Sequence, residues 1–89
     1  MSEKKETLLE FPCRFPIKAM GVDEDEFVAH VLNLISQHCP DIGEDDIKTR
    51  PSSGGKYVSV TVTVNATSQL QLDAIYYALT DSERVLMAL

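Results

Sequence analysis

The sequence lacks the features that identify membrane-embedded or secreted proteins. It has 89 residues, the length of a single domain, and a chain this short buries only roughly 60 to 65% of the surface that its unfolded form exposes. No apolar run approaches the ~18 residues of a membrane span, and the start, MSEKKETLLE, has no apolar core of a signal peptide. We therefore expect a cytoplasmic protein with a modest core and no membrane partner.

Basic residues and cysteines are also scarce. Eight Lys and Arg against fourteen Asp and Glu give a formal net charge of -6, which repels the phosphates of nucleic acids. Cys13 and Cys39 lie far apart and form no C-x-x-C pair, which predicts reduced, mostly buried thiols. The sequence therefore argues against nucleic acid binding, a disulfide framework and a cysteine metal site.

Groupings typical of enzymes are missing as well. His30 and His38 fall in one predicted helix, where Glu26, four residues before His30, offers only an ordinary surface pair. No serine stands in a nucleophile-elbow context, and no G-x-x-x-x-G-K-[ST] loop is present. We therefore expect no catalytic residues, no cofactor and no metal ligands.

What the sequence does contain is a hydrophobic period that switches between two and about 3.6 along the chain. Residues 1–9 have no period and predict a flexible tail, so the single domain spans 10–89. Within it the patterns predict, in order, a strand over about 15–22, a helix from Asp23 to just before Pro40, strands over 46–50 and 57–66, a helix after Ser68, and a strand over 84–89.

The two predicted helices begin with capping signals. Asp23 and Glu26 are spaced as a capping box for the first helix, and Ser68 and Gln71 for the second. The same spacing explains the acidic run at 23–26 as a helix start. Its alternative, a cation site, lacks the ligand spacing and glycine of an EF-hand loop.

This order of elements predicts an α+β fold. Each helix has one apolar stripe and the strand over 57–66 has one apolar face, so two helices should cover one face of a four-stranded antiparallel sheet. That is the ferredoxin-like βαββαβ two-layer sandwich, in which the first and third strands are central.

The stretch PSSGG, residues 51–55, allows two interpretations. A phosphate-binding loop leads into a helix N-terminus, where backbone N–H groups converge on the anion. This stretch leads into a strand, which favours a hairpin in which Gly54 and Gly55 supply positive φ, although anion binding stays open.

Three segments, LLEFPCRFPIKAMG, RPSSGGKYVSVTVTVNA and RVLMAL, resemble the YbeD-like family of small uncharacterised bacterial proteins over nearly the whole chain. The resemblance implies a fold similar to the ACT-type regulatory domains that bind amino acids. It also implies a link with lipoate metabolism, because genes of this family often neighbour one for lipoyl attachment. The family offers no agreed catalytic residues to transfer.

The face of the sheet without helices is the first candidate site. An RNA-recognition motif has the same element order but needs several stacking aromatic residues there, and the third strand offers only Tyr57. The face is either simply solvated or a contact surface with a charge and an aromatic anchor. Its expected members are Arg14, Lys18, Met20, Tyr57, Ser59, Thr61, Thr63, Asn65, Leu86 and Ala88.

The second candidate is the turn of Met20, Gly21, Val22 and Asp23, since the comparable turn of ACT-type domains holds an amino acid, usually at a dimer interface. A glycine at a strand end needs no such function. We therefore expect a non-enzymatic regulatory or adaptor domain that binds an unknown protein. The sequence also allows a homodimer. The alternative is an ACT-like sensor of a small metabolite.

Overall fold

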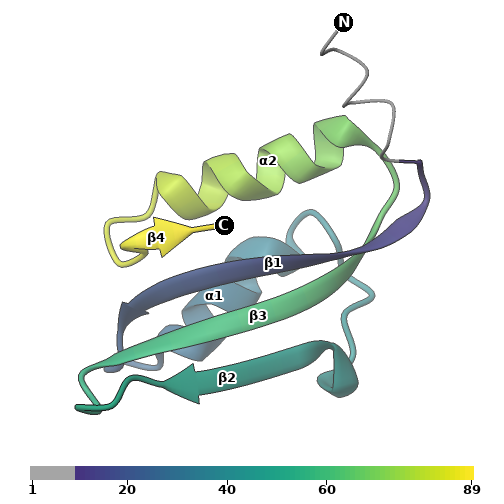
Figure 1. Ribbon diagram of the computed structural model, residues 1–89. Helices are drawn as coiled ribbons and strands as arrows, with labels where there is room; N and C mark the ends of the chain where they lie inside the picture. Colours follow the sequence, from purple (N-terminus) through teal and green to yellow (C-terminus); the bar gives the residue numbers. More distant parts are fainter. Residues whose placement is uncertain (1–9) are drawn as a thin grey trace, which may run out of the picture.

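The computed structural model describes residues 10–89, so the predicted tail lies outside the described residues. Four strands form one antiparallel sheet in the order β2-β3-β1-β4, with two α-helices on one side (Figure 1). The predicted ferredoxin-like α+β fold is confirmed, with β1 and β3 in the centre. The elements are β1 (Cys13–Val22), α1 (Phe27–Ser36), the short 3-10 helix η2 (Glu44–Asp46), β2 (Ile47–Pro51), β3 (Tyr57–Ala66), α2 (Gln69–Thr80) and β4 (Met87–Ala88).

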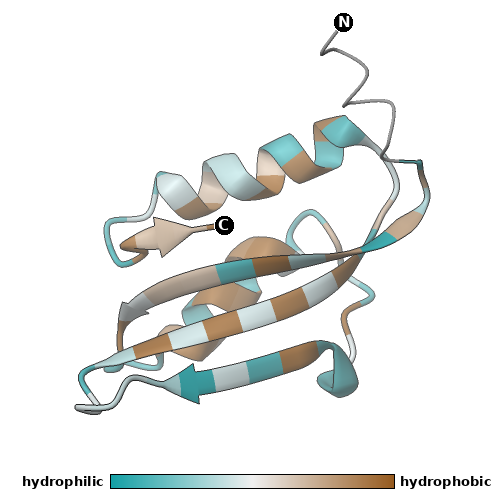
Figure 2. Cartoon of the chain, in the orientation of Figure 1, coloured by the Kyte–Doolittle hydropathy of each residue, from teal (hydrophilic) through white to brown (hydrophobic). Residues whose placement is uncertain are grey.

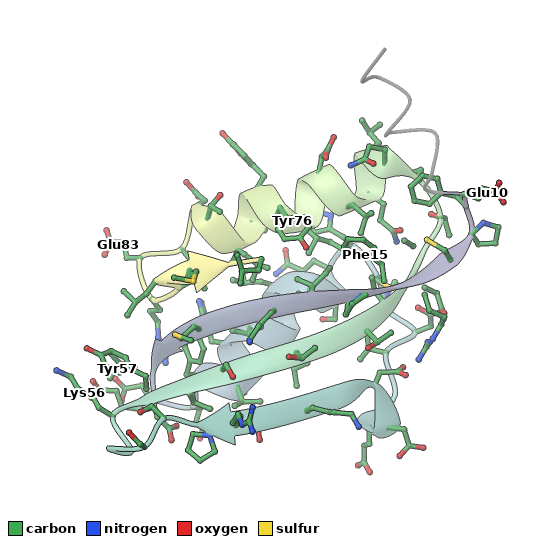
Figure 3. All side chains as sticks on the ribbon, viewed as in Figure 1. Glu10, Phe15, Lys56, Tyr57, Tyr76 and Glu83 are labelled. Atoms are coloured by element: carbon green, nitrogen blue, oxygen red, sulfur yellow. The ribbon has the colours of Figure 1, made fainter. Side chains whose placement is uncertain are left out.

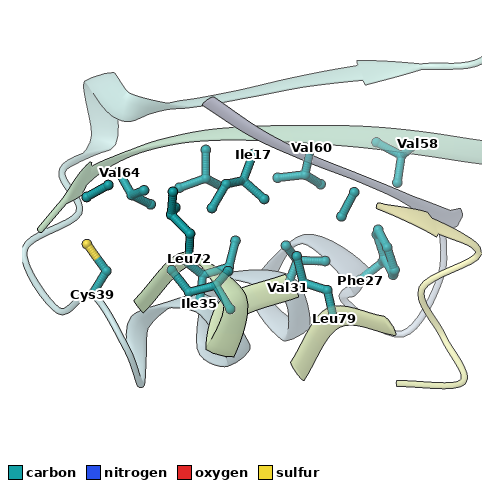
Figure 4. Close-up of a cluster of buried hydrophobic side chains, with 14 residues drawn as sticks. Ile17, Phe27, Val31, Ile35, Cys39, Val58, Val60, Val64, Leu72 and Leu79 are labelled. Carbon is teal, nitrogen blue, oxygen red and sulfur yellow. The ribbon is translucent and has the colours of Figure 1, made fainter. Parts of the chain in front are cut away.

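The core fills the space between the sheet and the helices, and Figure 4 shows strand and helix side chains meeting there. The alternation along β3 decides which face is covered, and it appears as alternating brown and pale bands in Figure 2. Every second residue of β3 is at most 5% exposed, as predicted: Val58, Val60, Val62, Val64 and Ala66. The opposite face of the sheet is called the open face below. No helix within residues 10–89 is long and apolar enough to cross a membrane.

β1 begins two residues earlier than we expected and includes Pro16. Two hydrogen bonds show which backbone groups of β1 point toward β4. The Lys18 amide donates to the Leu89 carbonyl, and the Met20 carbonyl accepts from the Leu86 amide. Pro16 is an even number of residues from Lys18, so its missing N–H lies on the same side. Since β4 pairs with β1 only around Met20, the proline costs no hydrogen bond to β3.

The start of α1 differs from the prediction. The helix begins at Phe27, and Glu26 is its N-cap residue with a left-handed backbone (φ 56°) and no side-chain hydrogen bond. Asp23 therefore does not cap the helix, and Asp25 is left-handed as well (φ 52°). The carbonyls of Glu24 and Asp25 instead accept hydrogen bonds from the Arg84 guanidinium at 2.7 Å. A long-range contact thus fixes this turn.

Ser68 caps α2 as predicted, but the return bond from Gln71 goes to Thr67 and not to Ser68, so the predicted capping box is only half formed. Ser68 Oγ accepts a hydrogen bond from the Gln71 amide at 3.1 Å, and Gln71 Oε1 accepts one from the Thr67 amide at 2.8 Å. Gln71 Nε2 also donates to the carbonyl of His38 at 2.8 Å, which ties the start of α2 to the segment after α1.

The stretch PSSGG ends β2 and makes the hairpin to β3. The Gly55 amide donates to the Ser52 carbonyl, and Ser52 also bonds Tyr57 through its backbone and hydroxyl. Of the two glycines, only Gly55 has a positive φ, 76°, so the expectation for Gly54 was wrong. These bonds close the turn internally, as a hairpin requires.

β4 is shorter than predicted, and the faces assigned to it were wrong by one residue. Met87 lies opposite Met20, and Ala88 opposite Ala19, which faces the core. Met87 therefore lies on the open face, whereas Ala88 packs toward the core and Leu86 precedes the strand. The chain turns just before pairing starts, so an alternation counted back through the turn loses its phase.

Candidate functional site

The open face brings together most of the residues that the sequence predicted for it. Along β1 and β3, every second side chain points into the core. The side chains between them point to the opposite side and share the open face. It points toward the viewer in Figure 3, with α1 behind the sheet. The predicted residues found here are Arg14, Lys18 and Met20 from β1, and Tyr57, Ser59, Thr61, Thr63 and Asn65 from β3.

The edge strand β2 adds two basic residues that the sequence analysis did not place in the site. Lys48 lies opposite Thr61 and Arg50 opposite Ser59, so both belong to the open face. Both are exposed, whereas Ser59 is only 8% exposed and its hydroxyl donates to the carbonyl of Arg50. The alternation of IKTRP, with Ile47 toward the core, was the signal that could have found them.

Two shallow hollows follow from this arrangement. The larger, about 260 Å³, is lined by Lys18, Lys48, Thr49, Arg50, Ser59 and Thr61, and we call it the basic hollow. A neighbouring hollow of about 170 Å³ shares Lys18, Arg50 and Ser59 with it and extends to Tyr57. No carboxylate of residues 10–89 lines either of them, although the whole chain has a net charge of -6.

An apolar area borders the basic hollow. Met20, Met87 and Leu89, together with the stem of Lys18, line a third hollow of about 200 Å³. Met87 and Leu89 are 51% and 64% exposed, so this area is open to a partner. Basic and apolar side chains therefore lie next to each other across β1.

An aromatic residue marks the hairpin end of the open face. Tyr57 and Lys56 lie together there in Figure 3, with the Lys56 ammonium 5.4 Å from the centre of the Tyr57 ring. Tyr57 is half-buried. It is thus a partly fixed aromatic side chain beside the basic hollow, the type of residue that is enriched at protein interfaces.

The other end of the open face holds a closed polar network. Arg14 pairs with Asp46 and donates to Asn65 Oδ1 at 3.0 Å, and Asn65 donates to Asp41 at 2.9 Å. The Arg14 hydrogen bond lowers the pKa of Asp46, and the Asn65 hydrogen bond lowers the pKa of Asp41. Arg14 is therefore occupied within the fold, unlike the cations of the basic hollow.

Asp41 also accepts a hydrogen bond from the thiol of Cys39 at 3.2 Å. Burial, and then this bond, raise the pKa of the Cys39 thiol, so it is protonated and weakly nucleophilic at neutral pH. Both cysteines are free, with Cys39 buried and Cys13 half-buried, as the sequence predicted.

Within the predicted ligand turn, Met20 to Asp23, the space beside Gly21 is filled by the protein itself. Gly21 is buried, and a Cβ there would lie 2.5 Å from the carbonyl oxygen of Arg84 and would overlap the Phe27 ring. The Asp23 amide is also used, because it donates to the Lys56 carbonyl at 2.8 Å. Packing against Phe27 and Arg84 explains the glycine without a ligand.

One polar contact joins residues that the sequence did not connect. His30 Nε2 and Ser82 Oγ share a hydrogen bond at 2.8 Å, and Ser82 Oγ also accepts from the Arg84 amide at 3.2 Å. Ser82 thereby closes the turn before β4 and ties it to α1. In residues 10–89, no three His, Cys, Asp or Glu side chains are grouped as metal ligands would be.

Sequence comparison finds similar proteins along the whole chain. Residues 6–89 match a family model described as a protein of unknown function, DUF493. A UPF0250 protein of Chromobacterium violaceum is 51% identical over 100% of both chains. Another of Neisseria gonorrhoeae is 48% identical over 98% of this chain and 96% of that protein. A third, of Nitrosomonas europaea, is 42% identical over 96% and 98%.

A solved structure is similar in fold. The solution structure of protein HP0495 from H. pylori superimposes with a TM-score of 0.69, over 91% of this chain and 85% of that chain. The two sequences are only 14% identical, so the similarity concerns the fold alone.

Proposed function

The chain belongs to the DUF493 family of unknown function, which is the YbeD-like family of the sequence motifs, and we propose that it is a non-enzymatic adaptor or regulatory module. It binds another protein through the open face of its sheet. The helices bury the opposite face, so the two faces have different tasks: one stabilises the fold and the other is available for contact.

One observation carries this proposal: the open face presents basic, aromatic and apolar side chains side by side. Protein interfaces are enriched in aromatic residues, Met and Arg, and this face contains Tyr57, Met20, Met87 and Arg50. A merely solvated face would more often mix charges of both signs. The basic hollow has only one sign of charge among the described residues.

Site-specific photocrosslinking in living bacteria tests the proposal. The chain offers a matched pair of tyrosines, Tyr57 on the open face and Tyr77 on α2, which is 75% exposed. Replacing either with p-benzoylphenylalanine exchanges one aromatic side chain for another and disturbs the fold little. We expect discrete protein adducts from position 57 and none from position 77, and Lys18→Ala should weaken the adduct from position 57.

Each outcome of this experiment has a defined meaning. Adducts from position 77 alone, or no adduct from position 57, would contradict the proposal, because the contact would then not lie on the open face. An adduct from position 57 with the mass of two 9.9 kDa chains would identify the partner as a second copy of this chain. The link with lipoate metabolism predicts a lipoyl-attachment enzyme in the adduct, and mass spectrometry of the band would test that link.

The sensor alternative makes a different prediction. Phe27 and Arg84 occupy the space beside Gly21, which argues against a ligand at that residue. A hollow of about 270 Å³ does lie beside the turn, lined by Val22, Glu24, Asp25, Glu83, Arg84 and Leu86. A saturable rise in the melting temperature with an amino acid, lipoate or an octanoate derivative would revive the sensor alternative.

A further inference from the structure

The basic residues of the described chain are concentrated on the open face. Of the eight Lys and Arg of the sequence, six lie in residues 10–89, and four of these six are Arg14, Lys18, Lys48 and Arg50 on this face. Within the described residues, the one ion pair joins Arg14 to Asp46. Three cations therefore surround one hollow without a carboxylate from residues 10–89 in contact.

The register of the sheet fixes how these three cations are spaced. Lys48, Thr61 and Lys18 form one row across β2, β3 and β1, so the Cα atoms of the two lysines are about 10 Å apart. Arg50 is two residues from Lys48, about 7 Å along β2. All three side chains line the basic hollow, where Thr61 adds a hydroxyl group. The Ser59 hydroxyl already donates its proton to the carbonyl of Arg50. This arrangement suits more than one carboxylate.

Along the row from β2 to β1, the apolar area of Met20, Met87 and Leu89 lies beyond Lys18, toward β4. From β2 to β4 the sheet measures three strand spacings, about 14 Å. An extended peptide covers about 13 Å in four residues, and its alternate side chains point to the same side. A ligand crossing the strands would thus place acidic groups over β2 and β1, and an apolar group near Met87 and Leu89 two residues later.

We infer that the basic hollow binds an acidic segment of a partner protein, with an apolar side chain seated against Met20, Met87 and Leu89. This inference rests on the proposed function and names the chemistry of the partner. The net charge of -6 disfavours nucleic acid, whose phosphates would be repelled by the rest of the surface. Charge complementarity instead favours a short acidic segment, because the local field of the hollow exceeds the distant repulsion within about a Debye length.

Fluorescence anisotropy with a labelled peptide tests this inference. The probe is Glu-Ser-Glu-Ser-Leu, which in extended form presents both glutamates and the leucine on one side. We expect binding with a Kd no weaker than about 1 mM at about 0.1 M salt, where the Debye length is about 10 Å. Replacing both glutamates with glutamine, or the leucine with serine, should weaken binding severalfold, and added salt should weaken it further.

Protein variants locate the contact. Lys18→Gln, Lys48→Gln and Arg50→Gln should each raise the Kd about two- to fivefold, as expected for exposed charge pairs. Lys56→Gln is the matched control, because it removes the same charge from an exposed residue outside the basic hollow. Backbone amide shifts in NMR spectra should move in β2 and β3 and stay unchanged in α2.

Four outcomes would overturn the inference. These are no binding at about 1 mM peptide, an equal effect of Lys56→Gln, full displacement by free succinate at the peptide's own concentration, or equally tight binding of a single-stranded oligonucleotide. Displacement by succinate would assign the hollow to a free dicarboxylate. Adducts from Tyr57 without peptide binding would keep the proposed function and reject only the acidic partner.

Discussion

Replacing Gly21 with alanine should destabilise the protein, and the structure shows why. Gly21 is buried at the end of β1, where the Phe27 ring of α1 and the carbonyl oxygen of Arg84 meet it. A Cβ at this position would overlap the ring and lie 2.5 Å from that oxygen. The oxygen belongs to the backbone of the turn before β4, so it cannot rotate away as a side chain would.

The expected cost follows from overpacking. Inserting a methyl group into a well-packed core costs about 1–3 kcal/mol, occasionally more. Replacing glycine with alanine also lowers the entropy of the unfolded chain, which offsets about 0.4–1 kcal/mol. We therefore expect the free energy of unfolding to fall by about 1–2 kcal/mol, which corresponds to a melting temperature lower by roughly 4–16 °C.

Urea denaturation of three alanine variants tests this reasoning. A Cβ added at Gly54 would meet no atom within 4 Å, and this residue has no positive φ, so Gly54→Ala should be neutral or slightly stabilising. Gly55 also has open space but a φ of +76°, so Gly55→Ala should cost about 1 kcal/mol through backbone strain alone. If Gly21→Ala is as stable as Gly54→Ala, the packing of β1 against Phe27 and Arg84 is not as described.

Two further predictions concern the helix starts and acid stability. Ser68→Ala removes the cap of α2 and should cost about 1 kcal/mol, whereas Glu26→Gly relieves a left-handed φ and should be neutral or stabilise by up to about 1 kcal/mol; the reverse order in urea denaturation would contradict both. The hydrogen bond from Asn65 holds the folded pKa of Asp41 below the value of about 3.9 in the unfolded chain. Its contribution to stability is therefore present above the unfolded pKa and is lost as the pH falls through the folded pKa. Asp41→Asn should make the melting temperature less dependent on pH in this acid range. An unchanged dependence of the melting temperature on pH would contradict the hydrogen bond between Asn65 and Asp41.

The predictable part of the fold was encoded in local patterns. Apolar residues occupy every second position of β3 from Val58 to Ala66, so its core-facing side could be predicted residue by residue. The cap of α2 needs only Ser68 and Gln71, which are three residues apart in the sequence. Such features depend on neighbours along the chain, and a single sequence reveals them.

The errors arose where distant residues decide the local structure. The turn before α1 is held by Arg84, some sixty residues later, which donates to the carbonyls of Glu24 and Asp25. No local pattern predicts that this contact is present where the sequence suggests a capping box. The phase of β4 depends on the pairing of Met87 with Met20 rather than on its own alternation. Likewise, Lys48 and Arg50 joined the candidate site only when the register of β2 with β3 was known.

The composition of the sheet's borders indicates how a partner would bind. Both borders carry residues that hinder strand addition: β2 has Lys48, Arg50 and Pro51, and the part of β1 beyond β4 has Arg14 and Pro16. Charges and prolines at edges discourage pairing with a further strand. The open face carries no comparable protection, since Met87 and Leu89 stay exposed beside the basic hollow. A partner is thus expected to dock on the side chains of the face rather than extend the sheet. Its specificity would then come from charge and shape rather than from backbone hydrogen bonds.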